Sequence, residues 1–123
     1  MPKRTIRREL GDVVAQMLDA IERCERFIDG MSYDEFRNDD RTHFAVIRSL
    51  EIVSEASRDI PKSVKSKHNG IPWHQIADSG NVYRHIYDKV SLRIVWDTAS
   101  VDLPSLKAML LAIDHESATN GSS

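Results

Sequence analysis

Apolar side chains recur at three- and four-residue steps along the first thirty residues, and this spacing limits the fold more than any other feature. The members of the pattern are Ile6, Leu10, Val13, Val14, Met17, Ile21, Cys24, Phe27 and Ile28. Side chains at such steps lie on one face of an α-helix, and that face must be buried against other elements. Gly30 follows at a position where glycine commonly ends a helix. The pattern predicts a long amphipathic helix that ends near Gly30.

Further helices are predicted from capping residues and from spacing. Ser32 and Glu35 have the spacing of a capping box, so a short helix should follow them. A third helix should begin near Asp40 and end by Ile60, because Pro61 disfavours helical geometry in the residue before it. Its inward side chains are predicted to be Phe44, Ile47, Leu50, Val53 and Ala56.

The second half of the chain continues the helical pattern. Residues 61–69 are predicted to form a basic connector, and Pro72 suits the first turn of a helix that continues to Val90. A short helix should follow over residues 92–96. The last helix is expected to begin at residues 102–104 and to turn inward Leu106, Met109, Leu110 and Ile113.

Signals for β-strands are nearly absent, since no alternating run of β-branched residues is longer than a few positions. The sequence therefore predicts an all-α fold, an antiparallel bundle of four main helices plus one or two short helices. Its 123 residues fit one domain. We expect that domain over residues 1–116, followed by a flexible tail over residues 117–123.

Composition narrows the classes of protein that remain. Cys24 is the single cysteine, which excludes an internal disulfide, and its place on the apolar stripe favours a buried thiol over a nucleophile. No apolar run approaches the roughly 20 residues that span a bilayer, so we expect a cytoplasmic protein. The net charge of −2 gives no overall basic field. Any contact with RNA would therefore need a local patch or two chains.

The segment from Pro72 to Val90 carries most of the candidate chemistry when it is read at about 100° per residue. One face is made by Ile76, Tyr83, Ile86, Tyr87 and Val90. Gly80 lies on that face, where its missing side chain allows a close approach of another helix. The opposite face is made by Asp78, Asn81, His85, Asp88 and Lys89.

His85 is therefore predicted to point away from its own bundle core, and two interpretations are open. It could belong to an ordinary solvated helix face. Alternatively, its imidazole could move a proton near neutral pH, while Arg84, Lys89 and Asn81 around it bind a phosphate.

Tyr87 lies at the edge of the core face, about 160° from His85 in a continuous helix. One interpretation is a packed ring with an exposed hydroxyl. The two residues could share one site only if the helix unwinds near Ile86 or if a second chain completes the site.

Basic residues and histidines elsewhere give weaker signals. A phosphate-tracking patch or a solvated loop could be formed by Lys62, Lys65 and Lys67. The spacing of metal ligands is not found among His43, His68, His74 and His115. We therefore predict no metal site and no cofactor.

Several segments in order resemble the HepT-like group of HEPN-domain proteins. Residues 80–87, Gly-Asn-Val-Tyr-Arg-His-Ile-Tyr, are similar to that family's polar motif of Arg, then Asn, then His-x-Tyr. Residues 45–56 look like its third-helix signature ending in Glu-Ala, and residues 71–77 look like its Pro-Trp entry to the motif helix. Val95 and Trp96 followed by residues 102–106 look like its C-terminal signature. The likeness covers most of residues 4–116.

The resemblance implies a metal-independent endoribonuclease toxin, in which the ribose 2′-OH attacks the adjacent phosphate. Family activity is associated with homodimers, and the usual partner is a small nucleotidyltransferase antitoxin that can nucleotidylate the motif Tyr. Carried over to this chain, His85 would be the general acid/base, Asn81 a positioning residue and Tyr87 the modification site. The alternative is a non-catalytic helical scaffold that binds the nucleotidyltransferase.

The motif departs from the family pattern at one position. The family's Arg stands directly before the Asn, where this chain has Gly80. Arg84 stands directly before His85 and one helical turn, roughly 5 Å, from Gly80. Its long side chain could replace the missing Arg, or the change could mark a protein that has lost catalysis.

Overall fold

The computed structural model describes residues 9–84 and 92–121, and side chains within residues 9–80 and 92–116. Its elements in chain order are α1 (Leu10–Ile28), α2 (Tyr33–Arg37), α3 (Asp40–Ser57), α4 (Lys62–Lys67), α5 (Trp73–Arg84), α6 (Leu92–Asp97), the π-helical turn η1 (Thr98–Asp102) and α7 (Leu103–Gly121). No strand occurs in these ranges. The predicted all-α class with four main helices is confirmed.

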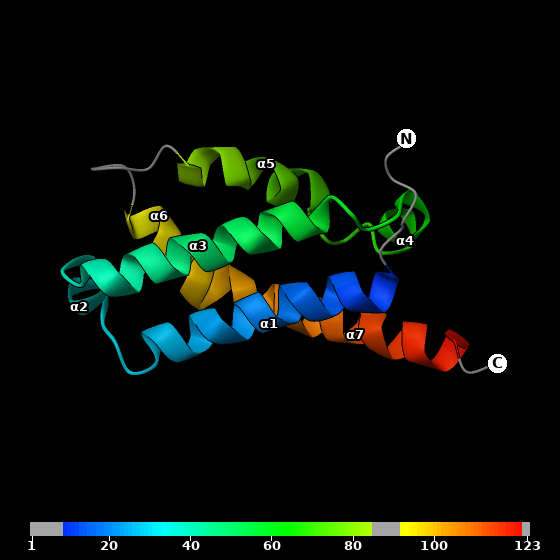
Figure 1. Cartoon of the computed structure of the whole chain (residues 1–123), viewed down its shortest axis with the longest axis horizontal. Helices are drawn as coiled ribbons and strands as arrows, with labels where there is room; N and C mark the ends of the chain where they lie inside the picture. Colours follow the sequence, from blue (N-terminus) through cyan, green and yellow to red (C-terminus); the bar gives the residue numbers. More distant parts are fainter. Residues whose placement is uncertain (1–8, 85–91, 122–123) are drawn as a thin grey trace, which may run out of the picture.

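The four long helices form an antiparallel bundle (Figure 1). Helices α1 and α3 pack side by side, α5 lies along α3, and α7 lies along α1. Each long helix runs opposite to the long helix that it packs against. Helix α5 is therefore held mainly by α3, and its other side is left toward solvent.

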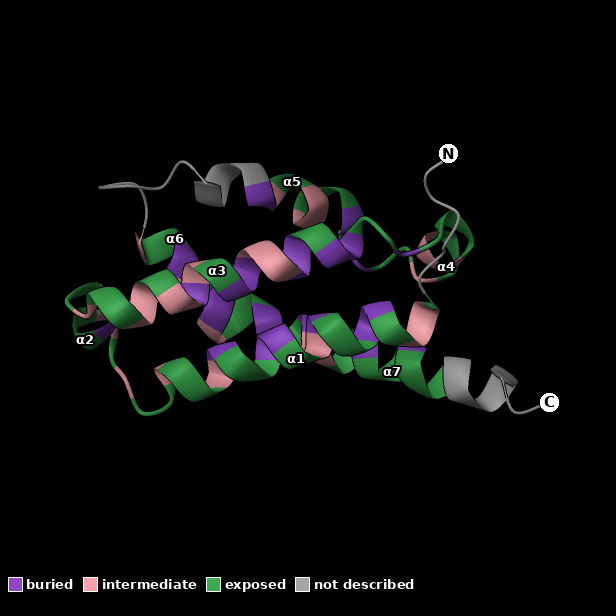
Figure 2. Cartoon of the chain, viewed as in Figure 1, coloured by how far each residue is buried: buried purple, intermediate pink, exposed green. Residues whose placement is uncertain are grey.

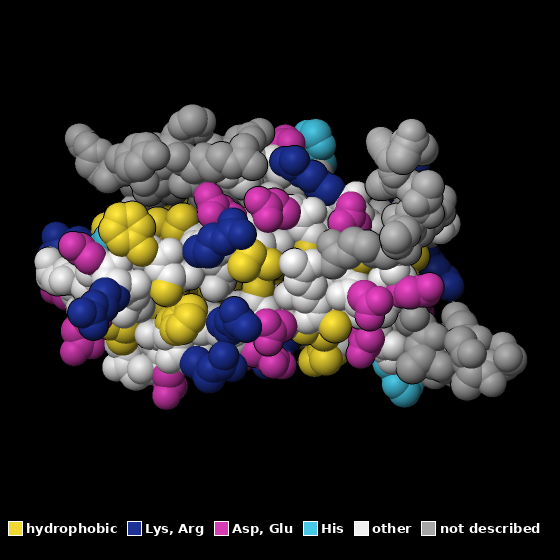
Figure 3. All heavy atoms as spheres, in the orientation of Figure 1, with side chains coloured by type: hydrophobic (Ala, Val, Ile, Leu, Met, Phe, Trp, Pro, Cys, Tyr) yellow, Lys and Arg dark blue, Asp and Glu magenta, His cyan; other side chains and the backbone are white. Residues whose placement is uncertain are grey.

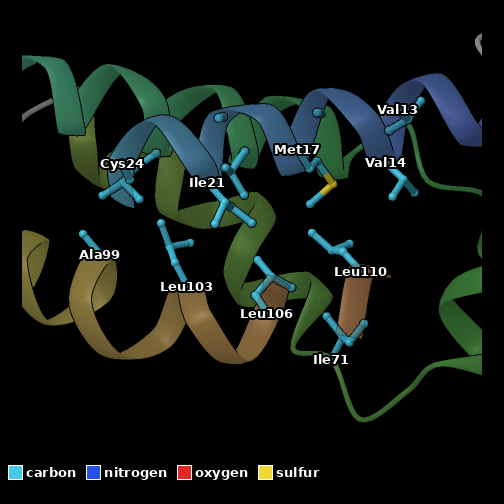
Figure 4. Packing of buried hydrophobic residues seen from close by; sticks show 14 of the residues in the cluster. Val13, Val14, Met17, Ile21, Cys24, Ile71, Ala99, Leu103, Leu106 and Leu110 are labelled. Atoms are coloured by element: carbon cyan, nitrogen blue, oxygen red, sulfur yellow. The ribbon is translucent and has the colours of Figure 1, made fainter. Parts of the chain in front are cut away.

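The core is one cluster in which α1 supplies a continuous inward stripe, formed by the fully buried Val13, Val14, Met17, Ile21 and Cys24. Of these, Val14, Met17 and Ile21 point toward Leu103, Leu106 and Leu110 of α7 (Figure 4), and the thiol of Cys24 lies 4.0 Å from the carbonyl oxygen of Val46 on α3. Buried residues line the inward helix faces and exposed residues line the outward ones (Figure 2). Burying one large aliphatic side chain contributes about 1.5–3 kcal/mol. Tertiary burial, more than helix propensity, therefore holds α1 in place.

The ends of α1 and α2 follow the predicted signals. Gly30 has a φ of 76°, the left-handed conformation that glycine adopts most easily after a helix. Ser32 Oγ accepts from the amide of Glu35 at 3.1 Å, and Glu35 Oε1 accepts from the amide of Ser32 at 2.8 Å. Both halves of the capping box are present, and they begin α2 at Tyr33.

The prediction that two aromatic side chains are buried in the core is wrong. Phe44 is 62 % exposed, because it lies about 120° around α3 from the buried Leu50 and Val46 takes the inward place. Phe27 is 37 % exposed, because Ile28 continues the inward line of α1 in its last turn.

Two element boundaries also differ from the sequence prediction. The basic connector contains α4, a short helix that was not predicted, in addition to α2 and α6. Pro61 begins it with a carbonyl that accepts from the amides of Val64 and Lys65. Helix α7 continues to Gly121 and so includes the first five residues of the expected tail. The π-helical turn η1 before α7 was not predicted, since a single wide turn leaves no periodic pattern.

None of the helices in the described ranges is long and apolar enough to cross a membrane.

Candidate functional site on helix α5

The first turn of α5 is anchored by Trp73, which is 8 % exposed. Its indole Nε1 donates to the carbonyl of His68 at 3.1 Å, and its amide donates to the carbonyl of Ile71 at 2.8 Å. A buried indole with a satisfied N–H fixes both the depth and the direction of the helix start. The Pro-Trp entry therefore sets where the rest of α5 runs.

The middle of α5 is bound to α3 through Ser54. Ser54 Oγ accepts from the amide of Gly80 at 3.0 Å and donates to the carbonyl of Ala77 at 2.9 Å. A Cβ added at Gly80 would lie 2.7 Å from this oxygen. The close approach that the sequence predicted at Gly80 is confirmed, and its partner is a serine that is 1 % exposed.

Arg58, the C-cap residue of α3, reaches the same turn of α5 from four residues after Ser54. Its Nη2 donates to the carbonyl oxygen of Ala77 at 2.7 Å. In an α-helix that oxygen also accepts from the amide four residues on, which is that of Asn81. Two hydrogen bonds end to end span at most about 6 Å. The guanidinium of Arg58 therefore lies beside the backbone that begins the motif.

The outward face of α5 is polar in its described part. His74 Nε2 lies 3.1 Å from Asp78 Oδ2, and the two side chains are 90 % and 63 % exposed. Figure 3 shows a histidine, an acidic and a basic side chain together over this part of the helix. At about 100° per residue, positions 74, 78 and 81 share this face. The prediction that Asp78 faces solvent is confirmed.

The structure describes only part of the predicted catalytic set. Asn81 and Arg84 lie in the last turns of α5, which is helical through Arg84, and their side chains fall outside the description. His85, Tyr87 and Lys89 lie outside the described residues. Whether the helix unwinds near Tyr87 therefore stays a prediction.

The three lysines predicted to contact RNA lie on α4. Lys65 Nζ is 6.0 Å from the centre of the Trp73 ring, at the limit of a cation–π contact. Lys62 and Lys67 are exposed. Because Lys65 touches the residue that anchors α5, the basic cluster lies near the beginning of α5 and away from its motif end.

A pocket of about 430 Å³ lies between α3, α5, η1 and α7. Pro72 and the α5 residues Gln75, Ile76 and Ser79 line one side of it. Position 81 lies nearly opposite these residues around the helix axis, at about 100° per residue. The pocket and the predicted catalytic face are therefore on different sides of α5.

Two further sequence predictions concern metal and thiol chemistry. Within the described residues no cluster of three His, Cys, Asp or Glu side chains could hold a metal ion. Cys24 is 0 % exposed, and burial raises the pKa of its thiol to about 11. The buried-thiol interpretation of Cys24 is confirmed, because a thiol of that pKa stays protonated at neutral pH.

Sequence reasoning did not single out Ser54 or Arg58. One signal was available for Ser54, a hydroxyl on the apolar face of α3 beside Leu50 and Val53, where a buried polar group needs a partner. No comparable signal identified Arg58, because an arginine at the end of a helix is common.

The chain is similar to known proteins over most of its length. The HepT-like ribonuclease family matches residues 17–113. A Thermococcus cleftensis protein named "Probable ribonuclease HepT" is 39 % identical over 102 residues, covering 83 % of this chain and 93 % of that protein. A Methanocaldococcus jannaschii protein named "Putative RNase" is 37 % identical over 107 residues, covering 87 % and 89 %. No solved structure matches the chain. The chain belongs to the HepT-like ribonuclease family.

Proposed function

We propose that this chain is a cytoplasmic, metal-independent endoribonuclease and the toxin of a toxin–antitoxin pair. The observation that carries the proposal is the family match over residues 17–113, which includes α5 and the His-x-Tyr motif after it. In the reaction, the ribose 2′ oxygen bonds to phosphorus and the bond from phosphorus to the 5′ oxygen breaks. The products are a 2′,3′-cyclic phosphate and a 5′-hydroxyl, and no water is consumed.

Three motif residues divide the work. In this reaction one proton leaves the 2′-OH and one proton reaches the departing 5′ oxygen. We assign one of these two proton transfers to His85 as general acid/base, because imidazole titrates near neutral pH. Arg84 stabilises the charged phosphate, since a guanidinium offers paired donors to its oxygens. Asn81 positions the substrate from the preceding turn.

The anchoring of α5 supports this assignment. Trp73 fixes the beginning of the helix, and Ser54 fixes the turn that leads into Asn81. A catalytic group works best when it is held by a rigid element. The exposed pair of His74 and Asp78 supports a solvent-facing position for Asn81 on the same helix face.

The partners are proposed from the family. The functional unit is a homodimer in which the second chain completes the site over the motif face. A small nucleotidyltransferase is the antitoxin, and Tyr87 is the residue that it modifies. RNA extends toward α4, where Lys62, Lys65 and Lys67 contact its phosphates, with Lys89 nearer the motif.

Controlled expression tests the proposal in cells. We expect wild-type protein to arrest growth and degrade RNA, and we expect His85→Ala to do neither. His74→Ala is the matched control, because His74 is an exposed histidine of α5, eleven residues before His85 in the sequence. It should behave as wild type. Normal growth and intact RNA with folded wild-type protein would exclude the ribonuclease toxin.

A second candidate function is a non-catalytic scaffold for the nucleotidyltransferase. The observation in its favour is Gly80, which stands where the family has Arg and whose missing side chain is replaced by Ser54 Oγ. A scaffold would bind the nucleotidyltransferase equally well with His85→Ala. It would lose binding when the exposed apolar side chains, such as Phe44, are replaced by serine.

A further inference from the structure

Arg58, the C-cap residue of α3, is the second described side chain that bonds to the carbonyl of Ala77, after Ser54. Ser54 Oγ donates to this oxygen at 2.9 Å and Arg58 Nη2 at 2.7 Å. The helical acceptor is already served by Ser54 and by the amide of Asn81. The hydrogen bond from Arg58 is therefore one more than this carbonyl oxygen needs.

The guanidinium of Arg58 has further donors to offer. A guanidinium carries five N–H donors in a planar fork, and the bond to Ala77 uses one nitrogen. The residue is exposed, so its charge is not confined to the protein interior. Two carboxylates of the same helices have partners of their own, since Asp78 lies 3.1 Å from His74 and Glu55 lies 3.9 Å from Arg48.

The register of α5 aligns this guanidinium with the motif. Residues 77 and 84 differ by seven positions, so they lie within about 20° on the same side of the helix and about 10 Å apart along its axis. Position 80, where the family pattern has Arg, lies between them. It has no room for a side chain, because Ser54 Oγ would be 2.7 Å from its Cβ.

We propose that Arg58 is a phosphate-binding residue for RNA, supplying from α3 the guanidinium that Gly80 cannot carry. This inference rests on the proposed ribonuclease function and names the contact that holds the strand beside the motif. Arg58 would bind the strand along the flank of α5 that carries Ala77. Because the carbonyl of Ala77 already holds the guanidinium of Arg58 in place, the side chain loses less rotational freedom when it binds a phosphate of RNA.

The test measures binding of a short 2′-O-methyl RNA, which has no 2′-OH to attack the phosphate. Anisotropy titrations over a salt series give Kd and its dependence on salt. We expect Arg58→Gln to raise Kd about tenfold, the effect of losing one charge-assisted contact. The slope of log Kd against log salt should fall by about 0.7, as for one phosphate contact to a single strand. Arg58→Lys should keep most of the slope and lose part of the affinity.

Two controls separate phosphate binding from a structural role. Arg23→Gln removes the same charge from α1, where Arg23 pairs with Asp19 at 3.2 Å, and should leave both quantities unchanged. Ser54→Ala removes the other side-chain donor to Ala77 while keeping Arg58. If Arg58 only held α5, then Ser54→Ala and Arg58→Gln would weaken binding alike with an unchanged salt slope. That result, or an unchanged Kd for Arg58→Gln, or no RNA binding by the folded wild type, overturns the inference.

Cleavage of ordinary RNA by the same proteins separates this inference from the proposed function. If RNA binding depends on Arg58 but the wild-type protein does not cleave RNA, the proposed ribonuclease function is rejected and the phosphate site is retained. Cleavage and binding that are unchanged in Arg58→Gln would reject the phosphate site and keep the ribonuclease.

Discussion

The hydroxyl of Ser54 bonds to the amide of Gly80 at 3.0 Å and occupies the space where a side chain at position 80 would begin. This contact joins α3 to α5 one residue before Asn81. It makes Gly80 a packing requirement of this chain, and in the ribonuclease that we propose the guanidinium would come from Arg84 and Arg58 instead.

Gly80→Ala should destabilise the protein even though alanine favours a helix. Alanine gains about 1 kcal/mol over glycine in helix propensity. Forcing a methyl group to 2.7 Å from Ser54 Oγ costs about 1–3 kcal/mol and strains the bond to the amide. We expect a net loss of up to about 2 kcal/mol in the free energy of unfolding, measured with urea.

A double-mutant cycle gives the control for this prediction. Ser54→Ala removes the clashing oxygen, so adding it to Gly80→Ala should cost less than the sum of the two single changes. Gly11→Ala is the matched glycine variant, because a Cβ at Gly11 meets nothing within 4 Å. It should leave stability unchanged or raise it. A Gly80→Ala protein as stable as Gly11→Ala would refute the packing argument.

Cys24 should make stability fall at high pH. Burial raises the pKa of its thiol to about 11 from 9.0, so the folded state keeps the proton longer than the unfolded state. The unfolded chain binds fewer protons between pH 9 and 11, and stability therefore declines as pH rises through that window. A rise in pKa from 9.0 to about 11 lets the free energy of unfolding fall by at most about 3 kcal/mol. Urea unfolding from pH 8 to 11 should show this extra decline in wild type and not in Cys24→Ala. Parallel pH curves would contradict it.

The capping box at Ser32 should contribute to stability through α2. Ser32→Ala removes the acceptor for the amide of Glu35 and should cost about 1 kcal/mol. Phe36 at the centre of α2 is 0 % exposed, so a weaker cap also loosens its packing. Ser66→Ala, on the exposed side of α4, is the comparison. Equal thermal midpoints for the two variants would show that the cap contributes nothing.

The fold could be predicted because its signals are local and repeated. The stripe of α1, the glycine at Gly30, and the capping box at Ser32 each specify a helix or its end from neighbouring residues. The predicted burial of Phe44 was wrong because spacing alone allows either of two neighbouring faces of α3 to be buried, and the packing of α1 decides between them.

The candidate site was predicted less completely, for a physical reason. Gly80 was identified as a close contact from its own helix, but its partner Ser54 is 26 residues away in the sequence. Arg58 contacts Ala77 across 19 residues, and no local pattern encodes that contact. Pairings between helices depend on the register of the whole bundle, which periodicity does not give.

Cleavage of RNA by purified protein in EDTA tests the central claim most directly. We predict that wild type produces fragments with 2′,3′-cyclic phosphate and 5′-hydroxyl ends, and that His85→Ala is at least about 100-fold slower, as expected for loss of a general acid/base. His74→Ala should match wild type. Intact RNA with folded wild-type protein, cleavage that needs a divalent metal, or equal rates for wild type and His85→Ala would contradict the account.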